Sequence, residues 1–239
     1  MPNKKSSSNQ DSKQILEALA KISEAVTSDK YLDDILKLIV TVTAEVMGSK
    51  ICSLMLLNDK KELVVKATQS ISDSYNQKPN IKLGDGLAGL VASEGKPLTS
   101  DDVREDKRYV NRDIAKKEGL YSLLCVPLRV KGEIIGVLNS YTSKPHKFSD
   151  AEIIMLNSVA NQAAIVIENF RLVVETKVVK EELEARKIIE RAKGILMKRR
   201  NLAEDEAYSL MRKYSMDNRK TIKEVANAII LNDEMNSIS

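Results

Sequence analysis

One long stretch without helix-breaking residues constrains this sequence more than any other feature. No proline occurs between Ser149 and Met197, and the first glycine in that range is Gly194. The stretch opens with Ser149 and Glu152, which have the spacing of a capping box at a helix start. A helix of ~45 residues is ~65 Å long, too long to be buried against one small domain. The pattern therefore predicts a connector helix, assigned to residues 150–185, with a separate folded module on each side.

The residues before this helix predict an α+β domain, assigned to residues 13–170. Amphipathic periodicity predicts its helices, and apolar runs on either side of polar turns predict β-hairpins. The expected helices are residues 13–26 and 31–47, and the expected strands are 51–57, 63–67, 97–100, 120–130 and 133–141. Residues 68–80 are polar and predict a mobile loop, and the serine-rich residues 1–12 predict a disordered tail.

An apolar stripe runs along the first half of the long helix. Its members follow one another at steps of four, three, four and three residues, which is the seam of a short parallel coiled coil. They are Val159, Ala163, Val166, Phe170 and Val173. The stripe predicts a homodimer, with Ile165 and Ile167 free to cover the domain's own sheet. In the alternative interpretation, the stripe itself packs on that sheet.

The C-terminal residues 186–235 predict a bundle of three short helices. Apolar residues recur at helical spacing in each segment, and Thr221 and Glu224 form a second capping box. Between Arg186 and Lys223 there are twelve Lys and Arg residues against five Asp and Glu. The whole chain carries a net charge of +4, so the remainder sums to about −3. The basic character is therefore local to the bundle.

Such a cluster of cations on short helices is suited to binding the phosphates of a nucleic acid. Small residues, Ala192 and Gly194, would permit close approach of the backbone. The candidate contact residues are Arg186, Lys187, Arg191, Lys193, Gly194, Lys198, Arg199, Arg200, Arg212, Lys213, Arg219, Lys220 and Lys223.

Part of this region resembles the ANTAR family of RNA-binding transcription antitermination regulators. The matching residues are Arg191-Ala192-Lys193-Gly194-Ile195-Leu196-Met197, Glu206-Ala207-Tyr208, Met211-Arg212, Met216, Ile222-Lys223-Glu224-Val225-Ala226 and Ile229-Ile230. Ser215 and Met211 depart from the family's usual Ala and Leu, and Ala203 stands where a capping Ser or Thr is expected. The resemblance implies a target of paired small hairpins in nascent transcripts, stabilised so that a terminator cannot form.

The middle of the chain, from about Tyr31 to Phe170, resembles a GAF domain. The residues that carry this likeness are Gly84-x-Gly86-x-x-Gly89, Gly95-Lys96-Pro97-Leu98, Asp102-Val103, Arg108, Ser122 to Leu128, Gly132 to Leu138 and Phe148-Ser149-Asp150. The resemblance implies a sheet flanked by helices that holds an unidentified small-molecule effector. The expected fold class is thus α+β, with an N-terminal GAF-like sheet flanked by helices, a long coiled-coil connector helix and a C-terminal three-helix bundle.

Other functional classes find little support in the sequence. Cys52 and Cys125 lie in apolar strands, which favours buried free thiols over a disulfide. His146 is the only histidine, so no zinc or haem constellation is present, and we expect no cofactor, no metal and no catalysis. Gly84 to Gly89 lacks the lysine of a phosphate loop and predicts a turn that opens a helix. No apolar run approaches ~18 residues, so we expect a cytoplasmic protein without a membrane span.

Two alternatives to RNA binding remain at this stage. A helix-turn-helix that binds DNA would need basic residues at the start of its recognition helix, where only Lys223 fits. A sensor dimer whose helical tail binds a protein partner would need no nucleic-acid site at all. Binding to hairpin RNA, to duplex DNA or to neither separates the three hypotheses.

Overall fold

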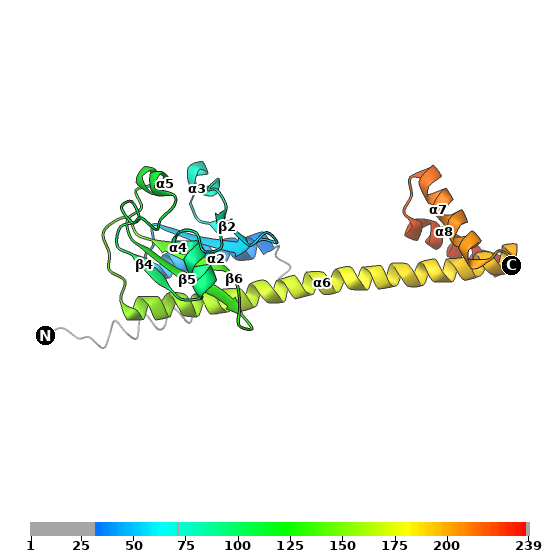
Figure 1. Cartoon of the computed structure of the whole chain (residues 1–239). Helices are drawn as coiled ribbons and strands as arrows, with labels where there is room; N and C mark the ends of the chain where they lie inside the picture. The colour runs from blue at the N-terminus through cyan, green and yellow to red at the C-terminus, as the bar shows by residue number, and fades with distance from the viewer. Residues whose placement is uncertain (1–31, 71, 238–239) are drawn as a thin grey trace. The chain divides into compact units, whose positions relative to one another are not determined.

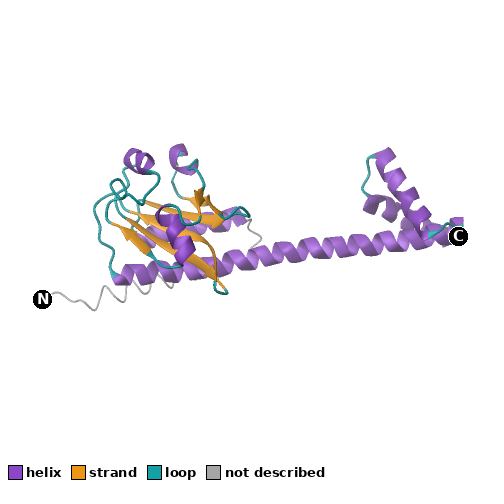
Figure 2. Cartoon of the chain, viewed as in Figure 1, coloured by secondary structure: helices purple, strands orange, loops and turns teal. Residues whose placement is uncertain are grey.

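A computed structural model of the chain describes residues 32–70 and 72–237. The predicted tail 1–12 and helix 13–26 lie outside the described residues. The chain divides into two compact units, Met1–Arg171 and Leu172–Ser239, which are considered separately below (Figures 1 and 2). The expected α+β class is confirmed.

The described residues of the first unit form one antiparallel sheet of six strands in the order β3-β2-β1-β6-β5-β4. The strands are β1 (Ile51–Leu57), β2 (Glu62–Thr68), β3 (Ile81–Lys82), β4 (Leu98–Ser100), β5 (Leu123–Val130) and β6 (Glu133–Tyr141). The two predicted hairpins are confirmed as the pairs β1–β2 and β5–β6. Lys61 and Lys131 adopt positive φ angles of 58° and 50° in their turns.

In the described part of the first unit, five helices begin. They are α2 (Leu32–Met47), α3 (Asp73–Asn76), α4 (Gly86–Glu94), α5 (Arg112–Lys117) and α6 (Asp150–Arg200). Gly48 ends α2 with a φ of +59°, as its position in the sequence predicts. Residues 68–80 are predicted to form a mobile loop, and the assignment of the whole segment to a loop is wrong in part. This segment contains α3, and Tyr75 within it is only 1% exposed because its ring packs into the core.

The two faces of the sheet carry separate cores because successive strand residues point to opposite sides. On one face, α2 and the first turns of α6 pack over residues that include Cys52 and Leu54. On the other face, α4 and the connecting segments pack over residues that include Met55 and Cys125. The two cysteines therefore lie on opposite faces as buried free thiols, which confirms that prediction. Burial raises the pKa of both thiols far above the ordinary value.

The predicted dimer seam needs a correction. Val159, Ala163 and Val166 are buried in the core between α6 and the unit's own sheet, and Phe170 packs against the same core. These side chains already have partners, so they are not available to a second chain. The alternative interpretation, packing on the sheet, holds for them, while Val173 is exposed. Ile165, expected on the sheet, is 48% exposed instead.

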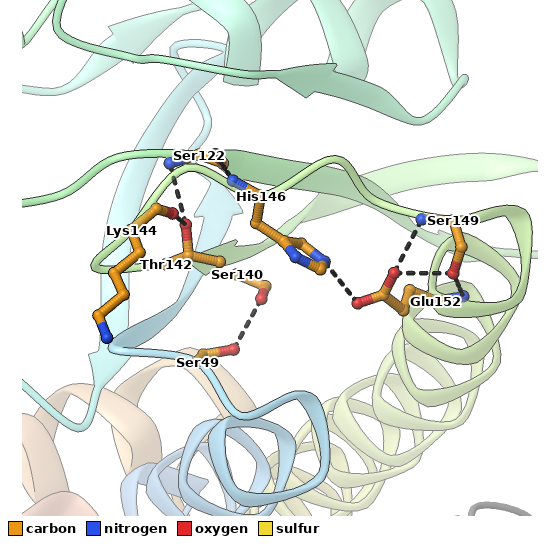
Figure 3. Close-up of polar contacts among 8 residues, drawn as sticks. All are labelled: Ser49, Ser122, Ser140, Thr142, Lys144, His146, Ser149 and Glu152. Carbon is orange, nitrogen blue, oxygen red and sulfur yellow. Dashed lines mark hydrogen bonds and ion pairs between the residues drawn. The ribbon is translucent and has the colours of Figure 1, made fainter. Parts of the chain in front are cut away.

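The start of α6 is fixed by the predicted capping box, which Figure 3 shows. The Ser149 amide and hydroxyl both donate to the Glu152 carboxylate, and the Glu152 amide donates back to Ser149 Oγ. His146 Nε2 lies 2.7 Å from the other carboxylate oxygen of Glu152. The sole histidine thus contributes to the helix start. Among the described residues, no group of three or more His, Cys, Asp or Glu is placed to hold a metal.

The expectation of no membrane span also needs an addition. Within the described residues, α6 is long and apolar enough over one part to qualify as a span by length and composition. Leu156, Val159, Ala160, Ala163, Ala164, Val166 and Ile167 lie in the core against the sheet, whereas Ile154 and Ile165 are exposed. Burial in the protein's own core therefore accounts for part of this apolar composition.

The segment from Gly84 to Gly89 is a turn that opens α4, as predicted. The Gly84 amide donates to the Gly89 carbonyl at 2.9 Å, and Gly86 adopts a φ of 62°. A Cβ at Gly89 would collide with the Lys82 carbonyl oxygen, so only glycine allows the backbone to approach this closely. These glycines serve the packing of α4 on the sheet.

Candidate nucleic-acid interface

The second unit is built around three helices: the C-terminal part of α6, α7 (Glu204–Asn218) and α8 (Ile222–Ser237). Their apolar residues recur at helical spacing and meet in one small core. The buried members are Ala192, Leu196, Ala207, Met211, Val225, Ala226 and Ile230. The predicted three-helix bundle is therefore present. Ala192 is part of this core, which corrects the expectation that it permits close approach of a ligand to the backbone.

The starts of α7 and α8 are capped to different extents. Thr221 and Glu224 form the predicted capping box of α8, with two bonds from Thr221 to the Glu224 carboxylate and one returned to Thr221 Oγ1. These bonds lower the pKa of Glu224. Ala203 at the start of α7 has no side-chain oxygen to offer. Only half of the arrangement forms there, as the Ala203 amide donates to the Glu206 carboxylate at 2.9 Å.

Lys193 lies in the bundle and not on its open surface. Its side chain is 9% exposed, and Nζ lies 2.6 Å from a Glu204 carboxylate oxygen and 2.9 Å from Glu190. The hydrogen bond to Glu204 is the main cause of a raised Lys193 pKa, and Glu190 adds to it. Because Glu204 begins α7, this contact joins α6 to α7. The prediction that Lys193 meets phosphates conflicts with this placement, which assigns the lysine a structural role.

Three of the other candidate cations form ion pairs at the surface. Arg191 NH2 lies 2.8 Å from Glu234, Arg199 Nε lies 2.5 Å from Asp233, and Lys187 Nζ lies 2.9 Å from Glu184. The first two pairs link α6 to α8. Exposed pairs of this kind contribute only ~0–1 kcal/mol each, so a phosphate can replace the carboxylate at small cost.

The remaining cations form no ion pair with any residue in the described part of the chain. They are Arg186, Lys198, Arg200, Arg212, Lys213, Arg219, Lys220 and the half-buried Lys223. Arg219 ends α7 in the left-handed conformation, with a φ of 52°, and the Ser215 hydroxyl donates to the Lys220 carbonyl. The α7–α8 turn thus places Arg219 and Lys220 side by side. Gly194 is exposed, with open space around it, as the sequence predicted.

An apolar groove of about 290 Å³ lies between the three helices. Leu210, Tyr214 and Ile229 line it, and Arg200 and Asn232 supply polar groups at its edge. Tyr214 is 57% exposed, and Tyr208 on α7 is also exposed. Unstacked RNA bases stack on such rings. Neither tyrosine is among the candidate contacts predicted from the sequence, although their spacing of six residues in a basic segment is visible there.

Comparison with known families divides the chain in the same way. The GAF domain profile matches residues 30–168, and the ANTAR domain profile matches residues 177–230. The solved GAF domain of a phosphoenolpyruvate-protein phosphotransferase from Coxiella burnetii has a TM-score of 0.59 and 28% identity, covering 66% of this chain and 95% of that one. A free methionine-R-sulfoxide reductase from Neisseria meningitidis, at 22% identity and a TM-score of 0.56, shares the fold.

Two similar curated proteins bear regulatory names. The methyl sulfide methyltransferase-associated sensor of Methanosarcina acetivorans is 28% identical over 155 residues, which are 62% of this chain and 16% of that protein. The transcriptional regulatory protein PdtaR of Mycobacterium tuberculosis is 31% identical over 91 residues, which are 38% of this chain and 42% of that protein. The chain therefore spans less than half the length of either relative. Together these matches support a regulator with a sensor domain and an RNA-binding domain.

Proposed function

Because the chain belongs to the GAF domain family and carries an ANTAR domain after its GAF domain, we propose that it is a signal-responsive, RNA-binding antitermination regulator. It binds paired hairpins in a nascent transcript and prevents formation of a terminator. It acts in the cytoplasm without catalysis. Both of its thiols are buried with raised pKa values, so neither is placed to act as a nucleophile.

The observation that carries this proposal is the set of cations on the bundle that form no ion pair within the described chain. Lys213, Arg219 and Lys220 are exposed at the end of α7 and in the turn that follows it. Release of condensed counterions from RNA phosphates favours binding at such a surface. The groove beside Tyr214 offers a ring on which a loop base can stack. A positive surface and an exposed ring together suit a hairpin with an open loop.

A gel-shift series tests the proposal. The probes are an RNA with two small hairpins, a single hairpin and a DNA duplex of equal length, each over a range of salt concentrations. We expect the two-hairpin RNA to bind most tightly and the duplex DNA weakly. Replacing Arg219 and Lys220 by Ala is expected to lower the salt slope by ~1.4, because each single-stranded phosphate that is no longer neutralised reduces the slope by ~0.7. A matched control replaces Lys60 and Lys66, exposed residues of the GAF domain, and is expected to change neither affinity nor slope.

Equal affinity for duplex DNA would favour the helix-turn-helix alternative. Failure to bind either nucleic acid would favour a helical tail that binds a protein. Transcription in vitro supplies the functional measurement, because a template with paired hairpins ahead of a terminator is expected to give more read-through when the protein is added. No rise in read-through, despite tight RNA binding, would limit the chain to RNA binding without antitermination.

The regulator is proposed to act as a homodimer, through a different stripe from the one predicted. In the second unit, Leu172, Thr176, Val179 and Leu183 follow at steps of four, three and four residues on α6, and the three apolar members are exposed. This spacing is that of a parallel coiled coil. Two bundles in one dimer match two hairpins and gain affinity from their effective concentration.

Light scattering tests this contact directly. The wild type is expected to be a dimer and Val179→Lys a monomer. Val178→Lys serves as the matched control, because Val178 is similarly exposed but lies off the stripe. A monomeric wild type, or equal effects of the two substitutions, would refute the proposed seam.

A further inference from the structure

Three tyrosines surround one lysine on the sheet face that α4 covers. Tyr75 lies on α3, Tyr109 on the segment before α5, Tyr141 at the end of β6, and Lys78 just after α3. The Lys78 ammonium lies 3.6 Å from the centroid of the Tyr75 ring, 5.2 Å from that of Tyr141 and 5.8 Å from that of Tyr109. All three distances lie within the range of cation–π attraction. We call Tyr75, Tyr109 and Tyr141 the tyrosine cage.

Contacts that do not involve Lys78 hold the cage in place. The Tyr75 hydroxyl lies 2.8 Å from Ser53 Oγ on β1, and the Tyr109 hydroxyl donates to the Tyr141 hydroxyl at 3.2 Å. The Tyr75 and Tyr109 rings each meet the Tyr141 ring edge to face, at centroid distances of 6.0 and 6.3 Å. The rings are therefore set by the sheet and by one another, and the cage persists when the lysine is withdrawn.

The Lys78 ammonium has few polar partners inside the tyrosine cage. Its ammonium donates to the Tyr109 hydroxyl at 3.2 Å, but no carboxylate among the described residues forms an ion pair with it. Burial lowers its pKa to about 7, although the charge of Glu118 favours the protonated form. A lysine ammonium is strongly hydrated, and three rings and one hydroxyl do not replace all of that water. The cage therefore holds a cation that loses much of its hydration on entering.

A second polar group on the same face is also incompletely satisfied. Asn139 alternates along β6 with Val137 and Tyr141, which face the cage side of the sheet. Its amide nitrogen donates to Ser53 Oγ, yet its buried Oδ1 accepts no hydrogen bond from any described residue. Because Ser53 also contacts the Tyr75 hydroxyl, this open acceptor belongs to the floor beneath the cage. Buried polar atoms without partners are uncommon and often mark functional sites.

The free space beside the rings is only about 10 Å³, roughly the volume of one water probe. Any ligand of the cage must therefore displace the Lys78 side chain. That side chain stands on the short connection between α3 and β3, next to Pro79, and the half-buried Asn111 and exposed Val110 border the same cavity. Displacement requires only that the end of a flexible chain swing outward past these residues.

We propose that the tyrosine cage is a binding site for a small methylated ammonium compound, and that Lys78 is its intramolecular occupant until the ligand arrives. The lysine identifies the ligand's chemistry, because it already places an alkylammonium against the rings. Methyl groups weaken the hydration of an ammonium, so a methylated cation loses less on burial than the lysine does, and aromatic cages favour such cations. This inference supplies the class of signal for the proposed sensor, but cage binding itself does not depend on RNA binding.

Calorimetric titration of the full chain tests the proposal with three small probes, each of which carries three or four methyl groups on one central atom. They are tetramethylammonium, which is positive, tert-butanol, which is neutral, and pivalate, which is negative. We expect tetramethylammonium to bind Lys78→Ala at least tenfold more tightly than the wild type, because the competing occupant is gone. Tert-butanol is expected to bind Lys78→Ala at least tenfold more weakly than tetramethylammonium. In the Lys78→Ala chain, adding Tyr109→Leu is expected to abolish binding, while adding Tyr109→Phe preserves it.

Several results would overturn the proposal. Equal affinity of tert-butanol and tetramethylammonium would reveal an ordinary apolar cavity. Binding of pivalate to the wild type that disappears in Lys78→Ala would make Lys78 the anchor of an anion site. Unchanged tetramethylammonium affinity in Lys78→Ala would place the cation elsewhere.

If Lys78→Ala does not fold, the wild type provides the decisive measurement. Tetramethylammonium is then expected to speed hydrogen exchange at residues 77–80, where Lys78 is released, and unchanged exchange would overturn the proposal. Hairpin gel shifts on the same samples report RNA binding separately. A failed cage and a failed RNA interface therefore give different results.

Discussion

Replacing Lys78 by Met is predicted to remove a specific pH dependence of stability. The lysine pKa is about 7 in the folded chain, against an ordinary value of 10.5. Between these values the unfolded chain binds more protons than the folded one, so stability rises with pH. The penalty for burying the charge is present in full below pH 7 and diminishes toward pH 10.5. Lys78→Met fills similar space without a charge and lacks this penalty.

The expected size follows from the same two pKa values. Each pH unit of full linkage is worth ~1.4 kcal/mol, and Lys78 is half-titrated at pH 7, so the gain between pH 7 and pH 9 is ~2 kcal/mol. The buried thiols of Cys52 and Cys125 act in the opposite direction, because only their unfolded forms ionise near pH 9. They subtract ~0.4 kcal/mol each at pH 9, equally in both proteins. The cage tyrosines also have raised pKa values and stay neutral over this range.

The assay is urea unfolding at pH 7 and pH 9, followed by the near-ultraviolet circular dichroism of the tyrosines, since the chain has no tryptophan. The quantity compared is the change in unfolding free energy between the two pH values, wild type minus Lys78→Met. A difference of ~2 kcal/mol is expected. Lys82→Met, on exposed β3 nearby, is the control and should behave as the wild type does. Parallel pH responses of the wild type and Lys78→Met would refute the burial of a charged lysine in the cage.

Three further predictions concern packing and capping. Lys193→Met is expected to lower the melting temperature of the bundle, because Glu190 and Glu204 lose the cation that they share. Circular dichroism measures this temperature. An unchanged melting temperature would indicate that Lys193 is a solvent-exposed residue without a structural role. Gly89→Ala is expected to prevent stable folding of the GAF domain, because a Cβ there would collide with the backbone. Gly194→Ala, in open space on a helix, is expected to stabilise the bundle by up to ~1 kcal/mol. Chemical denaturation of each variant measures these opposite effects on the free energy of unfolding. Thr221→Ala is expected to destabilise α8 by ~1 kcal/mol, with Thr41→Ala as a control outside any cap.

The elements that could be predicted well from the sequence are those set by local chemistry. The capping boxes at Ser149 and Thr221 form as expected, because their partners lie three residues away. The two hairpins follow from turn residues between apolar runs. The sheet order, in contrast, depends on the pairing of β1 with β6, which are more than 70 residues apart. No local pattern specifies that pairing.

The errors at the candidate site have a common physical cause. A helical stripe shows which face of a helix is apolar but not what covers it, and Val159 meets the sheet where a second chain was expected. In the same way, the sequence shows that Lys193 is charged but not which groups contact it, because its two carboxylate partners come from different helices. The tyrosine cage was invisible for a similar reason: Tyr75, Tyr109 and Tyr141 come from three separate segments, and only the fold brings them together.

The bundle's cations can be ranked by what each must give up to meet a phosphate. Lys193 would have to leave two carboxylates and an almost buried position, so it should contribute little to the salt dependence of RNA binding. Arg191 and Arg199 would exchange one exposed carboxylate each, at a cost of ~0–1 kcal/mol. Lys213, Arg219 and Lys220 leave no ion pair within the described chain and gain the full effect of counterion release. A count of positive charges cannot give this ranking, because each of these residues carries one positive charge. A salt slope that fell most on replacing Lys193, in a chain that stayed folded, would contradict this order.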